Sequence, residues 1–153
     1  MFTAKDVMSL REMSGAGMMD CKKALTECNG DMDKAMDYLR EKSLAASAKK
    51  AARIAAEGIV SSYVSQDAKL GVIVEVNCET DFVAKTDDFK ALVANVAKLV
   101  AEKNPADVDA LMAADCGNGT VAEMITRAVA KIGEKITIRR FARVEAANGC
   151  VDT

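Results

Sequence analysis

The chain has 153 residues, of which 50% are hydrophobic, 29% are charged and only 4% are aromatic. These proportions are typical of a soluble globular protein, and the length allows one ordinary domain, or a small domain and a medium one. The 21 basic and 23 acidic residues nearly balance, which argues against direct nucleic-acid binding, because nucleic-acid-binding domains usually carry a basic excess.

The sequence contains no histidine and five cysteines, none of them in a Cys-x-x-Cys pair. The commonest general base and metal ligand are therefore missing, and neither a zinc site nor a disulfide framework is indicated. Cys78 lies beside Glu79 and Asp81, carboxylates that would raise the pKa of its thiol, so we interpret it as a small, partly buried residue and not as a nucleophile. We expect no enzymatic activity, no catalytic residue, no metal and no cofactor.

Cysteine usage also favours a reducing compartment. The sequence shows neither a signal peptide nor a run of about 20 apolar residues. We therefore expect a cytoplasmic protein without membrane contact.

Residues 1–42 predict a compact three-helix unit. Thr3 and Asp6 form an N-cap signal, and the periodicity of the first helix places Val7 and Leu10 on its core face. A second helix follows the Gly-rich stretch 14–17, and Asp31 caps a third. Three short helices of this kind resemble a ubiquitin-associated (UBA-type) bundle.

Residues 43–57 are rich in alanine and predict a connecting helix, because the intrinsic helix propensity of this segment is high. Lys49, Lys50 and Arg53 form a small basic cluster within it. We interpret this cluster as a solvated face and not as a nucleic-acid patch.

Residues 58–153 predict a lobe of mixed structure. Two β-rich runs, 59–65 and 70–76, are separated by a hairpin-length loop, and residues 135–144 alternate as a third strand. Between them, Thr86 caps a long helix, a short helix follows near 108–112, and Thr120 with Glu123 forms a capping box for a further helix. The expected order is four helices, two strands, three helices and one strand.

The fold class that follows is α+β. It comprises an N-terminal three-helix UBA-like bundle, a connecting helix, and a three-stranded antiparallel sheet with helices on one face.

The segment 77–85, Asn-Cys-Glu-Thr-Asp-Phe-Val-Ala-Lys, joins the second strand to the helix capped by Thr86. It places Asp81 and Phe82 in a short polar loop. Two interpretations are open: Phe82 folds back as a core anchor while Asp81 caps a turn, or Phe82 is exposed and Val83 and Ala84 fill the core.

Thr80-Asp81-Phe82-Val83 resembles the signature of the elongation factor Ts family, the nucleotide exchange factors of elongation factor Tu. Further family-like motifs occur in the same order along the chain. They are the run 15–25 (Gly-Ala-Gly-Met-Met-Asp-Cys-Lys-Lys-Ala-Leu), Asn29-Gly30-Asp31, Ala56-Glu57-Gly58 and Lys131-Ile132-Gly133-Glu134. Because family members continue with a second core lobe and a C-terminal segment, the chain resembles their N-terminal half.

The resemblance implies a guanine nucleotide exchange factor of translation elongation, which binds elongation factor Tu and promotes GDP release by disturbing its Mg²⁺/phosphate site. It implies that Thr80, Asp81, Phe82 and Val83 contact the partner there and dislocate Mg²⁺. It also implies an apolar surface on the N-terminal unit that docks on the partner's nucleotide-binding domain, formed by Leu10, Met18 and Met19.

Alternatives stay open for the bundle. Met18 could serve only its core, but Met18 and its neighbour Met19 cannot both point inward, so at least one should be exposed. A different function is a UBA-type protein-binding adaptor without exchange activity, which would use the Met-rich bundle surface alone.

Without the family's second lobe, Ile136, Ile138 or Phe141 on the third strand should be partly uncovered. Weak self-association through this apolar surface is then expected.

Overall fold

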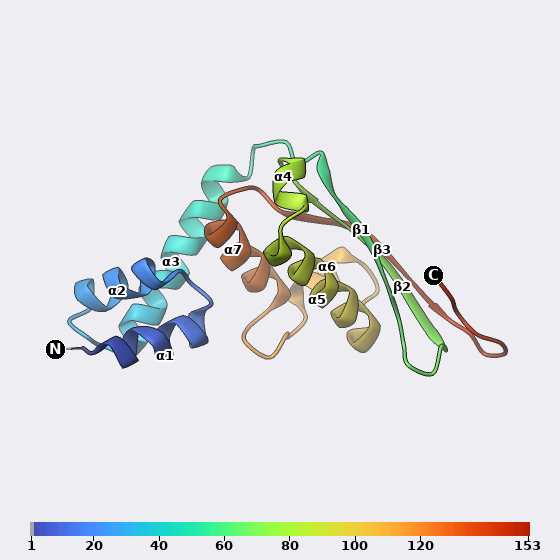
Figure 1. The fold of residues 1–153 in the computed structure, drawn as a ribbon, viewed down its shortest axis with the longest axis horizontal. Helices are drawn as coiled ribbons and strands as arrows, with labels where there is room; N and C mark the ends of the chain where they lie inside the picture. The colour runs from blue at the N-terminus through green and yellow to red at the C-terminus, as the bar shows by residue number, and fades with distance from the viewer. Residues whose placement is uncertain (1) are drawn as a thin grey trace. The chain divides into compact units, whose positions relative to one another are not determined.

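A computed structural model describes residues 2–153. Over these residues the order is three helices, two strands, four helices and one strand (Figure 1). The elements are α1 (Ala4–Ser14), α2 (Met18–Glu27), α3 (Met32–Lys50), β1 (Glu57–Val64), β2 (Leu70–Cys78), α4 (Asp81–Ala84), α5 (Asp87–Lys103), α6 (Val108–Ala113), α7 (Val121–Ile132) and β3 (Thr137–Glu145).

The chain forms two compact units. The first runs to Ala52 and includes Thr126–Glu134, and the second comprises Arg53–Ile125 and Lys135–Thr153. In the part of the chain that the structure describes, no helix combines the length and the apolar character needed to cross a membrane.

The helix caps of the first unit are those that the sequence predicts. The Asp6 amide donates to the Thr3 hydroxyl at 3.4 Å, and the Asp6 carboxylate accepts from the Thr3 amide at 2.7 Å, which completes a capping box. Asp31 caps α3 by accepting from the Lys34 amide at 3.1 Å. These short-range bonds satisfy amides that have no partner inside the helix.

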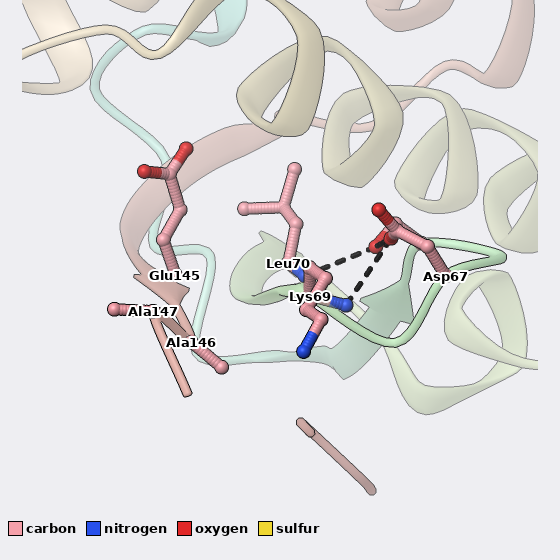
Figure 2. Close-up of a pocket in the computed structure, with 7 residues that line it drawn as sticks. Asp67, Lys69, Leu70, Glu145, Ala146 and Ala147 are labelled. Atoms are coloured by element: carbon pink, nitrogen blue, oxygen red, sulfur yellow. Dashed lines mark hydrogen bonds between the residues drawn. The ribbon is translucent and has the colours of Figure 1, made fainter. Parts of the chain in front are cut away.

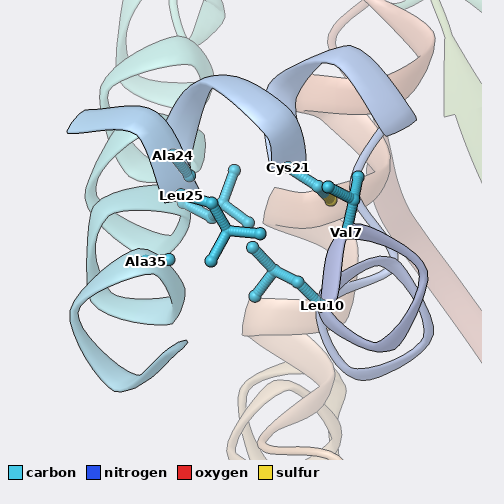
Figure 3. Packing of buried hydrophobic residues seen from close by; sticks show 7 residues of the cluster. Val7, Leu10, Cys21, Ala24, Leu25 and Ala35 are labelled. Carbon is cyan, nitrogen blue, oxygen red and sulfur yellow. The ribbon is translucent and has the colours of Figure 1, made fainter. Parts of the chain in front are cut away.

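A small apolar core joins α1, α2 and α3 (Figure 3). Leu10, Cys21 and Leu25 are fully buried in it, and the partly buried Phe2 packs against the cluster. The buried members are Val7, Leu10, Cys21, Ala24, Leu25, Ala35 and Leu39.

The separate connecting helix predicted over residues 43–57 is wrong as an element. Residues 32–50 form one continuous helix, α3, and the chain leaves it before β1 begins at Glu57. The physical reason is that no glycine, proline or asparagine interrupts the run from Leu39 to Lys50, while its alanines favour the helix. The predicted order of elements is therefore also wrong. Three helices instead of four precede β1, and four instead of three lie between β2 and β3.

The second unit contains an antiparallel sheet in the order β1-β2-β3, with β2 at its centre. Along β2, Val72, Val74 and Val76 are buried while Ile73 between them is exposed, so one face of the sheet is covered. Helix α5 packs against β1 and β2 on the covered face (Figure 1). Its fully buried side chains are Phe89, Val93, Val96 and Val100. The predicted α+β fold class is confirmed.

The predicted exposure of Ile136 and Ile138 is wrong, since both side chains are buried, whereas Phe141, the third residue of that prediction, is partly exposed as expected. The register explains this, because Ile138 lies opposite Val76 and so points to the covered face. The exposed apolar residues of the sheet are instead Val60, Ile73 and Val144, which the register places together on the opposite face. Self-association itself stays a prediction.

Gly58, at the start of β1, provides a test of this sheet. It has φ +150°, and a Cβ there would lie 2.2 Å from the carbonyl oxygen of Val76 on β2. We expect Gly58→Ala to lower the free energy of unfolding by about 1–3 kcal/mol, measured by urea denaturation. Gly117→Ala is the control, because Gly117 also has positive φ but nothing within 4 Å of the added methyl group. Equal losses in the two variants would contradict the proposed clash.

Candidate functional site

The residues of the Thr-Asp-Phe-Val motif form α4, a single helical turn that directly follows β2. The sequence predicted a polar loop here, and the difference arises from the Thr80 N-cap, whose hydroxyl accepts from the Val83 amide at 3.4 Å. The Ala84 amide donates to the Thr80 carbonyl at 3.3 Å and the Lys85 amide to the Asp81 carbonyl at 3.2 Å. The motif therefore has a defined backbone conformation.

Within this turn the side chains divide between core and solvent. Phe82 is 79% exposed, Val83 is half-buried and Ala84 is buried. Of the two interpretations of the motif, the core anchor is wrong, because the smaller Ala84 fills the interior position. Among the large hydrophobic side chains that are exposed in residues 2–153, Phe82 is the one aromatic ring, which makes it a candidate contact residue.

Both ends of α4 are bonded to neighbouring elements. At its start, the thiol of the fully buried Cys78 donates to the Thr80 carbonyl at 3.1 Å. At its end, the Thr86 hydroxyl donates to the Val83 carbonyl at 2.7 Å and also accepts from the Phe89 amide at 3.3 Å, so one side chain closes α4 and caps α5. Cys78 is thus a buried structural residue at the end of β2.

Asp81 forms an ion pair with Lys85 one turn later, with 2.6 Å between Oδ2 and Nζ. The hydrogen bond from Lys85 and then its positive charge hold the pKa of Asp81 below the usual value, and the same contact raises the pKa of Lys85. Both side chains are exposed, so water screens this pair. The sequence analysis did not identify Lys85 as a partner of Asp81, because the spacing of four residues brings the two together only once the segment is helical.

Glu79, which immediately precedes the cap, is a second residue that sequence reasoning missed. Its Oε1 accepts from the Lys135 amide at 2.6 Å and from Arg53 Nη1 at 3.3 Å. These partners lie 56 and 26 residues away along the chain. No local pattern in a single sequence could have found contacts at such separations.

The second predicted surface lies on the N-terminal unit. Met18 is 40% exposed and Met19 is 75% exposed at the start of α2, in agreement with the argument that both could not point inward. Leu10 is fully buried in the bundle core, so its predicted place on the surface is wrong. The reason is the spacing of three residues between Val7 and Leu10, which directs both toward the same face of α1.

A hollow at the other end of the sheet is not part of this site. It lies between the β1–β2 turn and the end of β3, and is lined by Ser65, Asp67, Lys69, Leu70, Glu145, Ala146 and Ala147 (Figure 2). From Leu70 to Cys78, β2 is about 26 Å long, and the hollow and α4 lie beyond its opposite ends. It is shallow and open to solvent. Within residues 2–153 no three His, Cys, Asp or Glu side chains gather as metal ligands would.

The Asp81–Lys85 pair predicts a pH dependence. A lowered carboxylate pKa means that the contact is complete above the ordinary Asp value of 3.8 and is lost as pH falls through the lowered value. The raised pKa of Lys85 means that the contact persists to the ordinary Lys value of 10.5 and is lost above it. We expect the Asp81 carboxyl carbon, followed by NMR, to titrate below pH 3.8, and Lys85→Met to move its midpoint upward. An unchanged midpoint in that variant would contradict the ion pair.

Comparison with known proteins relates the sequence of this chain to one family. Residues 79–153 match the model of the family described as "Elongation factor TS". The chain is 57% identical over 154 residues to "Elongation factor Ts" of Clostridium perfringens (strain 13 / Type A), a match that covers 100% of this chain and 51% of that protein. It is 53% identical over 156 residues to "Elongation factor Ts" of Clostridium tetani (strain Massachusetts / E88), with the same coverage.

A relative from a third organism gives the same result. The chain is 57% identical over 144 residues to "Elongation factor Ts" of Azoarcus sp. (strain BH72), covering 94% of this chain and 48% of that protein. The chain spans about half the length of the curated relatives it matches, consistent with the resemblance to the N-terminal half. Over its whole length the chain is thus similar to proteins of the elongation factor Ts family.

Proposed function

We propose that this chain acts in translation elongation as a guanine nucleotide exchange factor, which binds elongation factor Tu and promotes the release of GDP. The observation that carries the proposal is the exposed Phe82 on the ordered turn α4. The similarity to this family supports it, because the names of the relatives assign them to elongation. The proposed activity needs no bond to be made or broken, so the chain is not an enzyme in the usual sense.

The proposed mechanism begins with the ring of Phe82 entering between side chains of the GTPase near its Mg²⁺ site. The ring shifts the elements that hold the metal. Mg²⁺ bridges phosphate oxygens and is often the largest local charge in such a site, so its displacement weakens the grip on GDP. Thermodynamic linkage adds that the factor must bind nucleotide-free elongation factor Tu more tightly than the GDP-bound form, by the same ratio.

The ordered conformation of α4 supports this role energetically. Binding costs free energy for each side chain or segment that must be immobilised. The cap by Thr80 and the bond from Thr86 to Val83 hold the turn in place before a partner arrives. A phenylalanine side chain offers a large apolar surface but has few rotatable bonds. It therefore loses less conformational entropy on binding than a flexible side chain of similar size, and more of the free energy of contact remains to shift the GTPase.

Asp81 and Val83 extend the contact on either side of the ring. Asp81 is held toward Lys85 in the free protein, so a partner cation or donor must compete with that ammonium group for the carboxylate. Because the Asp81–Lys85 pair is exposed and screened by water, replacing Lys85 by a group of the partner costs little free energy and also gains little. Asp81 therefore contributes less than Phe82.

A second contact is proposed for the N-terminal unit. Met18 and Met19 adjoin on α2 and expose flexible thioether side chains, which adapt to apolar surfaces of irregular shape. They would dock on the nucleotide-binding domain of elongation factor Tu. Leu10 supports this surface only from within the bundle core.

Phe82→Ala tests the first contact. We expect this variant to lose most of the acceleration of GDP release, measured with a fluorescent GDP analogue bound to elongation factor Tu. We expect its free energy of unfolding to stay within about 0.5 kcal/mol of the parent, because an exposed ring contributes little to the core. Asp81→Ala should act in the same direction but less strongly.

Val60→Ala is the matched control for Phe82→Ala, since Val60 is also an exposed apolar residue of the same unit. It should release GDP at the parental rate. A parental rate in Phe82→Ala would contradict the wedge. A parent chain without any acceleration would favour the UBA-type adaptor instead.

Met19→Ala tests the second contact. Truncation of an exposed Met at an interface should weaken binding by about 1 kcal/mol, or about fivefold in Kd, measured by titration calorimetry against nucleotide-free elongation factor Tu. Met8→Ala is the control, because Met8 is a similarly exposed methionine on α1 outside the proposed contact. Parental affinity in Met19→Ala would remove this residue from the interface.

A further inference from the structure

Glu79 occupies the joint between the end of β2 and the start of α4. We propose that it is a positioning residue for this turn, whose carboxylate fixes the direction in which Phe82 and Asp81 face. The inference rests on the proposed function for what those two side chains meet. Its physical basis is a set of contacts among three segments of the second unit.

The contacts of Glu79 form a closed arrangement. Oε1 accepts from the Lys135 amide at 2.6 Å, and Arg53 Nη1 lies 3.3 Å from Oε1 and 3.5 Å from Oε2. The ammonium group of Lys135 in turn donates to the Arg53 carbonyl at 2.9 Å. Glu79 therefore joins the chain ahead of β1, the chain after β2 and the chain ahead of β3.

These bonds are stronger than an ordinary surface ion pair. The side chain of Glu79 is only 20% exposed, and a hydrogen bond that an ionised carboxylate accepts is about twice as strong as one between neutral groups. A backbone amide as donor also adds no side-chain entropy cost. The carboxylate is thus held in one place relative to the strands.

Helix α4 depends on such anchors. A single turn of four residues has no independent helical stability, because nucleation of a helix is unfavourable and needs longer segments or tertiary contacts. Its C-terminal end is fixed by Thr86, and only the N-cap Thr80 separates its first residue from Glu79. A change in the backbone at residue 79 would therefore displace Phe82, three residues further along.

Glu75, which lies within β2, offers a matched control. Its side chain is 17% exposed, and it pairs with Arg140 at 2.6 Å and with Arg139 at 3.7 Å. It thus resembles Glu79 in burial and in its arginine partner. It differs in that it lies within β2, away from the motif, so its loss should not reorient α4.

The test compares Glu79→Ala, Glu79→Gln and Glu75→Gln with the parent. We measure hydrogen exchange of the amides of residues 83–85 in the free protein, and the maximal rate and half-saturating concentration of GDP release with elongation factor Tu. Glu79→Ala should speed amide exchange and lower the maximal release rate about tenfold, since small displacements of positioned groups have effects of this size or larger. Glu79→Gln keeps an acceptor for the Lys135 amide without the charge and should be intermediate, while Glu75→Gln should match the parent.

Parental amide exchange at residues 83–85 in both Glu79 variants would overturn the proposal. Slower release with parental amide exchange would also overturn it, because Glu79 would then touch the partner itself. If Glu79→Ala does not fold, Glu79→Gln decides by the same two measurements. If the parent chain accelerates no GDP release, the proposed function fails, and amide exchange alone decides whether Glu79 positions α4.

Discussion

The packing of α5 against the central strand β2 is the constraint on which the second unit depends. Three alternate valines of β2 are buried against this helix, whose own inward stripe is closed to solvent. Each fully buried apolar side chain of this size contributes about 1.5–3 kcal/mol relative to exposure. Because α4 spans only the few residues between β2 and α5, this packing sets the distance and direction that the turn must cover.

Features with short-range causes could be predicted from the sequence. The caps by Thr3, Asp31, Thr86 and Thr120 each involve a partner three residues away, so the signal and its contact fit in one window. The strands followed from alternation and the hairpin from its loop. The length of α3 could not be predicted, because the end of a helix without a stop signal depends on its tertiary contacts. The burial of Ile138 could not be predicted either, because it depends on a strand register that only the folded sheet defines.

The candidate site shows the same division. The motif predicted Phe82 and Asp81 as candidate site residues. The exposure of Phe82, however, depends on Ala84 occupying the interior position, and the helical conformation of the motif depends on the Thr80 cap. Resemblance and periodicity disagreed about Leu10, and the burial of Leu10 follows the periodicity. The contacts of Glu79 join segments far apart along the chain, which no local pattern encodes. Sequence thus identified the side chains that we propose to face a partner, but not the residues that hold them in place.

Since α4 is too short to be stable alone, the proposed recognition element is a property of the whole lobe and not of its nine-residue segment. A synthetic peptide of residues 77–85 would sample many conformations and lose most of its contact energy to ordering on a partner. Grafting the motif onto another scaffold would require a buried strand end, a capped helix start and a carboxylate anchored to the neighbouring backbone. The Thr-Asp-Phe-Val motif therefore indicates a surface that the whole lobe assembles. The same four residues in a protein without these supporting contacts need not have the proposed activity.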